Sequence, residues 1–197
     1  SWDGKDYKNM SDQDEAKFRM IEYHKWKFKA KIFSPLAPLT VKRTPVLMTR
    51  VEYGFLGSYN KYKKSPFETF YMGGDGMSGY SSTYATETIG LRGYENGSIA
   101  GNGGYNSYGY AYSRLSMELR YPFLLEPSST IYGLVFVEAG NAWRDLKDFN
   151  PFQLKRSAGV GVRIFLPMIG LMGIDWAYGF DRPDGYDQRG GSNFHFI

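Results

Sequence analysis

Strict two-residue alternation of polar and apolar side chains constrains this chain more than any other feature. Between residues 23 and 33 a lysine stands at every second position, with aromatic or aliphatic residues between the lysines. The two sets are Lys25, Lys27, Lys29 and Lys31, and Trp26, Phe28, Ala30 and Ile32. Successive side chains of a β-strand point to opposite faces, whereas a helix would scatter both sets around its axis. This segment is therefore predicted to be a strand with one cationic and one apolar face.

Six further segments are predicted to be strands, most of them with the same alternation, and they are separated by stretches rich in glycine, proline and aspartate. They cover residues 44–57, 114–121, 131–143, 157–166, 171–180 and 193–197. A tight turn is expected from Pro122 to Ser129, where two prolines and two serines cluster. The sequence thus predicts an all-β fold of about seven antiparallel strands.

The polar faces of these strands indicate a membrane protein. A soluble sandwich would turn its apolar face inward and place solvated side chains on the other face. Here the other face includes Gly159, Gly161, Gly173 and Ala177, which are poor choices for a solvated surface. Connections alternate between short and long, and strands of about ten residues suit a tilted crossing of the hydrocarbon layer. We therefore predict an antiparallel transmembrane β-barrel over a soluble sandwich.

Seven strands, the last of them short, do not complete such a barrel, because the smallest bacterial examples have eight. Residues 1–197 are accordingly interpreted as the C-terminal half of an outer-membrane β-barrel. More chain, or a second copy, would have to complete it, since an unpaired strand edge in lipid is costly.

A long insert rich in glycine, tyrosine and serine interrupts the strands at residues 58–108. Connections beyond about 12–15 residues are usually functional or disordered. Its core reads Leu91-Arg92-Gly93-Tyr94, which predicts a loop that folds back into the barrel lumen and anchors a cation there. Glu138 is the lone charge of an otherwise apolar strand, and a buried carboxylate needs a partner.

Four segments resemble motifs of the BamA family of outer-membrane protein insertases. Leu91 to Tyr94 resembles the family's V/I-R-G-F/Y loop motif, and residues 136–143 resemble its F-x-D-x-G-N-x-W strand, with Glu138 in place of the usual Asp. Residues 157–163 with Pro167 resemble S-A-G-x-G-x-R…S-P-x-G, and residues 194–197 resemble the start of the terminal F-x-F-x-I-G strand. The motifs occur in order over nearly the whole chain, so together they are specific.

The resemblance implies roles for particular residues. Arg92, with Gly93 and Tyr94, is expected to latch the loop inside the barrel by contacting Glu118 and Glu138. The last strand is expected to form a lateral seam that opens and templates client strands. The seam residues are Asn193, Phe194, His195, Phe196 and Ile197.

The same resemblance implies a non-enzymatic assembly factor of the bacterial outer membrane. Its expected partners are unfolded outer-membrane clients, periplasmic accessory lipoproteins and the lipid bilayer. Two alternatives stay open: a two-partner secretion pore that exports a protein, and the barrel anchor of a surface enzyme.

The residues themselves offer no catalytic or cofactor machinery. The chain has no cysteine and no G-x-S-x-G motif. His24 and His195 are far apart, and neither has a second ligand at metal spacing. We therefore predict no catalytic site, metal or cofactor. The lysine stripe is interpreted as a hydrated lumen wall rather than an anion pathway or a nucleic-acid contact, because no aromatic side chains interleave on that face.

Overall fold

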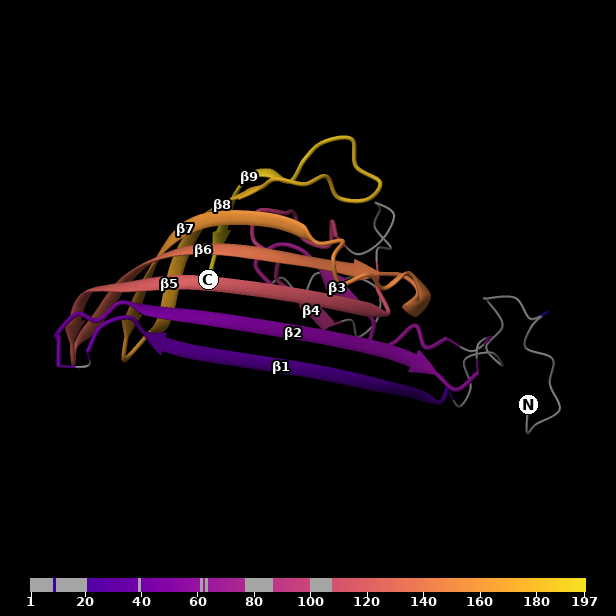
Figure 1. The fold of residues 1–197 in the computed structure, drawn as a ribbon, viewed down its shortest axis with the longest axis horizontal. Coiled ribbons are helices and arrows are strands. Elements are labelled where there is room, and N and C mark those ends of the chain that lie inside the picture. Colours follow the sequence, from indigo (N-terminus) through magenta and orange to yellow (C-terminus); the bar gives the residue numbers. More distant parts are fainter. Residues whose placement is uncertain are drawn as a thin grey trace.

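The structure, a computed structural model, describes residues 9, 21–38, 40–60, 62, 64–76, 87–99 and 108–197. Its main feature is a seven-stranded sheet in which every neighbouring pair is antiparallel, in the order β1-β2-β5-β6-β7-β8-β9 (Figure 1). The strands are β1 (Tyr23–Pro35), β2 (Val46–Ser58), β5 (Ala111–Glu126), β6 (Ser129–Trp143), β7 (Lys155–Leu166), β8 (Gly170–Gly179) and β9 (Gly191–Phe196). The predicted all-β class and the seven antiparallel strands are confirmed.

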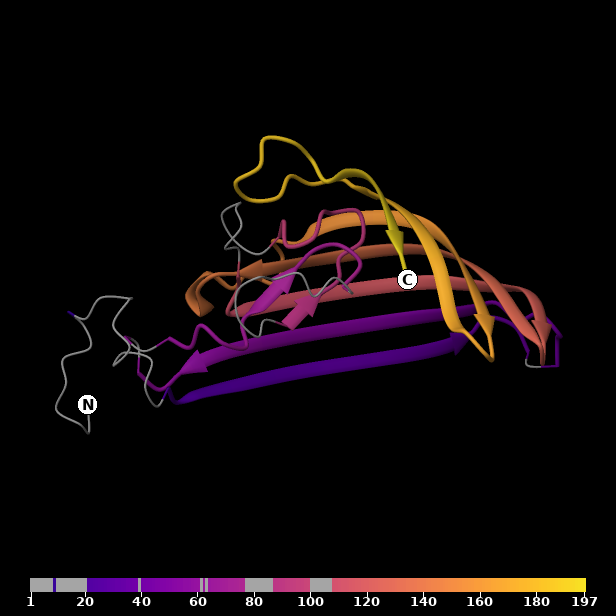
Figure 2. The ribbon, with the colours of Figure 1, turned by 180° about the vertical axis from the view of Figure 1, so that it is seen from behind.

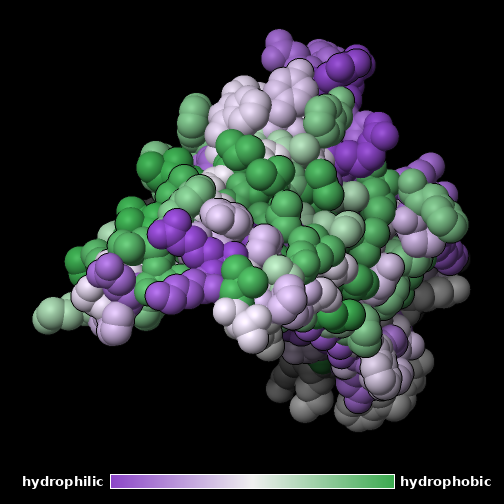
Figure 3. Space-filling model, turned by 60° about the vertical axis from the view of Figure 1, so that its left-hand side comes forward, coloured by the Kyte–Doolittle hydropathy of each residue, from purple (hydrophilic) through white to green (hydrophobic). Residues whose placement is uncertain are grey.

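The sheet curls along its width, and the two opposite views show the insert lying within the curl (Figures 1 and 2). Alternating side chains give the sheet an apolar outer face: Trp26 is 70% exposed and Val135 is 56% exposed. Charged side chains on the inner face, such as Glu138 and Asp175, are buried. Hydrophobic residues cover much of the molecular face in Figure 3. This arrangement, apolar outside and polar inside, is the pattern of a lipid-facing barrel wall.

The expected turn at Pro122 to Ser129 is wrong in extent. Strand β5 continues through Pro122 to Glu126, and only residues 127–128 form the turn to β6. Pairing of β5 with β2 ends at Arg120, so beyond that point β5 pairs on its β6 side alone. Proline is tolerated where a strand has one free edge, because its missing N–H breaks no ladder bond there. The register shift between Pro122 and Leu124 marks a bulge at this place.

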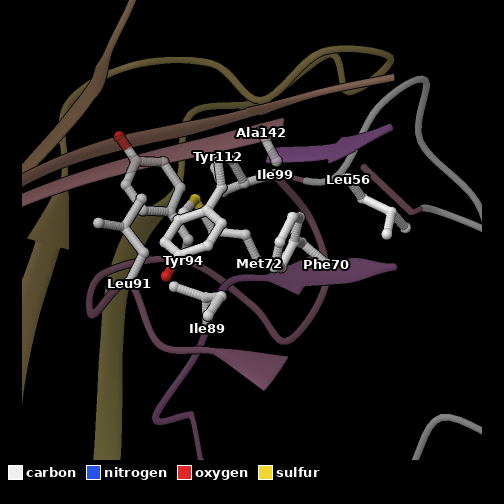
Figure 4. Packing of buried hydrophobic residues seen from close by; sticks show 9 residues of the cluster. All are labelled: Leu56, Phe70, Met72, Ile89, Leu91, Tyr94, Ile99, Tyr112 and Ala142. Carbon is white, nitrogen blue, oxygen red and sulfur yellow. The ribbon is translucent and has the colours of Figure 1, made fainter. Parts of the chain in front are cut away.

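The insert between β2 and β5 has structure of its own. Strand β3 (Phe70–Met72) pairs in parallel with β4 (Glu87–Ile89), and single bridges join Phe70 to Gly109 and Gly74 to Leu91. Its side chains form the main apolar cluster with the inner face of the sheet (Figure 4). The cluster contains Leu56, Phe70, Met72, Ile89, Leu91, Tyr94, Ile99, Tyr112 and Ala142. The insert therefore docks on the sheet through a small core of its own.

Short elements complete the fold. A single 3-10 turn, η1 (Leu146–Asp148), lies in the connection between β6 and β7. Within the described ranges, no helix has the length and apolar character needed to cross a membrane. Strands β1 and β9 are the two edges of the sheet.

Candidate functional site

Arg92 lies on the turn that follows β4 and reaches carboxylates from three strands of the sheet. Its Nη2 lies 2.6 Å from Oε1 of Glu118 on β5 and 2.6 Å from Oε1 of Glu138 on β6. Its Nη1 donates to Oδ2 of Asp175 on β8 at 2.8 Å. The Arg92 site, defined as Arg92 with Glu118, Glu138 and Asp175, thus ties the insert to the middle of the sheet.

The Arg92 site is almost free of solvent. The side chains of Glu138 and Asp175 are fully buried, and that of Arg92 is 6% exposed. The Arg92 guanidinium stacks on the ring of Phe136, with 3.5 Å between Cζ and the ring centroid. The Arg92 backbone N–H also donates to Oε2 of Glu138 at 2.9 Å. Glu138 therefore holds both the side chain and the main chain of the insert at one position.

Further arginines complete the neutralisation of these carboxylates. Arg114 donates to Glu138 at 2.9 Å, and Arg120 donates to Glu118 at 2.7 Å. Arg163 donates to Oδ2 of Asp175 at 2.6 Å. Each of the three carboxylates thus accepts hydrogen bonds from at least two guanidinium groups. A network this well satisfied can exist in a dry interior, where an unpaired charge could not.

Glycines on β7 and β8 make room for the network. A Cβ at Gly161 would lie 1.8 Å from Oδ1 of Asp175, and a Cβ at Gly173 would lie 2.5 Å from Cδ of Arg163. Any larger residue would displace one of the two charged groups. This close approach explains why small residues occupy the inner face of these strands.

Gly93 connects the insert to the last strand, β9. Its N–H donates to Nε2 of His195 at 2.9 Å, and its carbonyl accepts from Nδ2 of Asn193 at 3.1 Å. Its φ is +90°, and a Cβ there would lie 2.8 Å from the Cβ of Ser157. Only glycine satisfies both the left-handed backbone and this close approach. The insert therefore contacts edge strand β9 through its main chain.

Tyr94 anchors the same turn in the apolar cluster. It is fully buried, and Figure 4 shows its ring among Leu91, Met72 and their neighbours. Its hydroxyl donates to the carbonyl of Arg156 at 2.6 Å and accepts from the N–H of Asp181 at 3.3 Å. Burial raises the pKa of the Tyr94 phenol to about 12, so the hydroxyl keeps its proton and can donate.

The structure brings together all five residues expected at the loop latch, namely Arg92, Gly93, Tyr94, Glu118 and Glu138. It also adds groups that the sequence analysis missed. Asp175 is the only charged residue of β8, the same signal that singled out Glu138, and it could have been found in that way. His195 and Asn193 were assigned to the seam, and the structure turns both side chains toward Gly93. Phe194 and Phe196 face outward, 67% and 66% exposed.

The Arg92 site is a structural ion-pair network rather than a reaction centre. Its carboxylates are occupied by guanidinium groups. In the described part of the chain, no three His, Cys, Asp or Glu side chains group in a way that could hold a metal ion.

Comparison with known proteins identifies the family. The chain matches the Omp85 superfamily domain over residues 17–197. Its fold is similar to the crystal structure of BamA from Haemophilus ducreyi lacking POTRA domains 1–3, with a TM-score of 0.62 at 21% identity. The match covers 89% of this chain and 35% of that one, so the chain spans about a third of that protein's length. No curated protein sequence matches the chain significantly. The curled sheet with its apolar outer face and the family match together lead to one conclusion: the chain belongs to the Omp85 superfamily and is part of a bacterial outer-membrane β-barrel protein.

Proposed function

We propose that this chain is the C-terminal part of the barrel of a non-enzymatic factor that inserts client proteins into the outer membrane. Membership of the Omp85 superfamily supports a role in insertion or transport at that membrane. The more specific proposal, that the chain templates client strands, rests on the position and contacts of β9. Within the described structure this strand lies at the edge of the sheet and is held on its inner side by the insert.

An edge strand can act as a template. Its outer row of backbone N–H and C=O groups offers hydrogen bonds to an incoming strand, the mode of recognition known as β-augmentation. Strand β9 is therefore the proposed lateral seam, formed by Asn193, Phe194, His195, Phe196 and Ile197.

The Arg92 site is the proposed latch that keeps the seam in shape. The carboxylates of β5, β6 and β8 fix Arg92, and the adjoining Gly93 holds the side chains of Asn193 and His195. Since the latch and the seam share one turn of the insert, loosening Arg92 would also loosen the inner side of β9.

The proposed partners follow from these surfaces. The apolar outer face suits the lipid bilayer, and the free edge of β9 suits an unfolded outer-membrane client. Periplasmic accessory lipoproteins would bind the parent protein outside this chain. A secretion pore or an enzyme's membrane anchor would use the same barrel without pairing β9 to a client.

Site-specific cross-linking tests the proposal. The chain has no cysteine, so a single cysteine at Phe194 is unique within it. In the full-length protein reconstituted in lipid, Phe194→Cys is expected to form a disulfide with a cysteine in the terminal strand of a client barrel during its insertion. The matched control is Val137→Cys on the outer face of central strand β6, where the native side chain is also exposed.

Cross-links confined to Phe194→Cys support templating at the seam. Equal capture at both positions would indicate non-specific collision with the lipid-facing surface and would remove the templating proposal. Capture of an exported soluble protein at inner-face positions, with none at Phe194→Cys, would favour the secretion pore.

A further inference from the structure

The lysine face of β1 (Lys25, Lys27, Lys29 and Lys31) is divided by the insert into two parts. Lys25, Lys27 and Lys29 converge on Glu87 of β4, with Nζ to carboxylate oxygen distances of 2.9, 3.0 and 3.7 Å. Lys31 has no ion pair with any described residue. Its register partner on β2 is another cation, Arg50. Three lysines of the stripe therefore have ion pairs with the insert, and Lys31 has none among the described residues.

Arg50 is the more unusual of this pair. It lies on the inner face of β2, between the buried side chains of Met48 and Glu52, and makes no ion pair within the described ranges. Its Nε is shielded from solvent and has no hydrogen-bond acceptor in the part of the chain that the structure describes. A guanidinium donor that is buried without an acceptor costs free energy, which a bound acceptor would recover.

A cavity of about 360 Å³ lies beside Arg50, between the sheet and the insert. Six cationic residues line it, against three carboxylates. They are Lys29, Arg50, Arg92, Arg114, Arg120 and Arg163, and Glu52, Asp75 and Glu118. Glu118 already accepts from Arg92 and Arg120, and Glu52 lies 3.8 Å from Arg114. Arg92, Arg114 and Arg163 are also paired with Glu138 or Asp175, and Lys29 with Glu87. Arg50 is therefore the lining cation that has no ion pair among the described residues.

We propose that this cavity is an oxyanion-binding site with Arg50 as its main ligand. The planar guanidinium of Arg50 offers the paired donors that a phosphate group accepts. Lys29 lines the cavity, and Lys31 adds positive charge from the register position opposite Arg50. The ligand class is a phosphate or phosphomonoester, either free in solution or carried on a lipid headgroup. The site does not depend on strand templating at β9, so the two proposals stand or fall separately.

Calorimetric titration of the full-length protein in zwitterionic detergent tests the site, with inorganic phosphate in one arm and dihexanoyl phosphatidic acid in the other. Arg50→Gln removes the charge and is expected to weaken phosphate binding by at least about tenfold, the scale of one charge-assisted hydrogen bond. Lys31→Gln is expected to weaken it by a smaller factor. The control is Lys147→Gln, an exposed cation in η1 that is remote from the cavity lining.

Binding that falls in Arg50→Gln and Lys31→Gln but not in Lys147→Gln supports the site. Loss confined to the phosphatidic acid arm would identify a lipid headgroup as the source, and loss in both arms would show that free phosphate suffices. No binding by the unmodified protein, or equal binding by all variants, would overturn the proposal. Lys31 is exposed on its strand, so Lys31→Gln keeps the test decisive if Arg50→Gln does not fold.

Discussion

The insert is fixed to the sheet at two ionic clusters of opposite composition. At one, Glu87 lies among three lysines of β1, one of which, Lys25, also pairs with Glu68. At the other, Arg92 of the insert lies among three carboxylates from β5, β6 and β8, which arginines of the sheet also contact. The Glu87 side chain is 23% exposed, whereas that of Arg92 is 6% exposed.

Burial makes the two clusters unequal although both are ionic. Exposed ion pairs contribute about 0–1 kcal/mol, because water and salt screen them and long side chains lose entropy. Removing one partner of a buried network strands charge in a medium of low dielectric and costs about 3–5 kcal/mol. The Arg92 site is therefore expected to contribute most of the stability with which the insert is held on the sheet. The Glu87 cluster is expected to be an auxiliary contact that responds to pH and salt.

Arg92→Ala is expected to have the largest effect. It leaves Glu118, Glu138 and Asp175 without their shared partner, so the free energy of unfolding should fall by about 3–5 kcal/mol. Urea unfolding of the full-length protein measures the loss, and limited proteolysis reports release of the insert. An insert as protease-resistant in Arg92→Ala as in the unmodified protein would contradict the proposed latch. Arg92→Lys keeps the charge but not the fork of donors. Its free energy of unfolding is expected to lie between those of Arg92→Ala and the unmodified protein.

Gly93→Ala is expected to destabilise the protein by about 2–4 kcal/mol. An alanine would be strained in the left-handed backbone conformation, and its Cβ would overlap with the Cβ of Ser157. The matched control is Gly170→Ala in the turn between β7 and β8. Gly170 has a φ of +98°, but no atom lies within 4 Å of its ideal Cβ position. The control therefore carries the backbone strain alone. Equal losses for both variants would show that the contact of Gly93 with β7 contributes nothing.

Tyr94→Phe is expected to cost about 1–2 kcal/mol, because the hydrogen bonds of the hydroxyl with the Arg156 carbonyl and the Asp181 N–H are lost. Tyr112→Phe is the control within the same apolar cluster. The Tyr112 hydroxyl is buried and makes no hydrogen bond with any described residue, so its removal should be neutral or slightly stabilising. Thermal unfolding of both variants measures the difference. A larger loss for Tyr112→Phe would contradict the role given to the Tyr94 hydroxyl.

Glu87→Gln is expected to have the smallest effect, below about 1 kcal/mol at neutral pH. Burial alone would raise the pKa of Glu87, but hydrogen bonds from Lys25 and Lys27 outweigh it and hold the pKa below its ordinary value of 4.5. The contribution of Glu87 is therefore present above that ordinary value and is lost as the pH falls through the lower value of the folded state. Hydrogen exchange of the β4 amides should accelerate over this acidic range, and high salt should reduce the effect.

The acid response should disappear in Glu87→Gln, which cannot ionise. If Glu87→Gln keeps the same acceleration, the pH dependence arises elsewhere, and the auxiliary role of this cluster is wrong.

Much of the fold could be predicted from alternation alone. The lysine stripe of β1 and the glycines of β7 and β8 distinguish the two faces of the sheet before any contact is known. The lone charge of Glu138 in an apolar strand predicted that it has a partner, and the resemblance to the BamA family implied that this partner is Arg92. The extent of β5 could not be predicted, because the tolerance of Pro122 depends on where pairing with β2 stops.

The local sequence pattern by itself determined which residues form strands and which faces are apolar. This is because side-chain direction in a strand repeats every two residues. Only the tertiary structure decided which charges meet. Asp175 lies 83 residues from Arg92, and His195 lies 102 residues from Gly93. Their approach depends on strand register and on the path of the insert. The same register placed Lys31 opposite Arg50 and left both without an ion pair in the described structure. The sequence determines which charges each strand carries, but the register determines which charges are neighbours across the sheet.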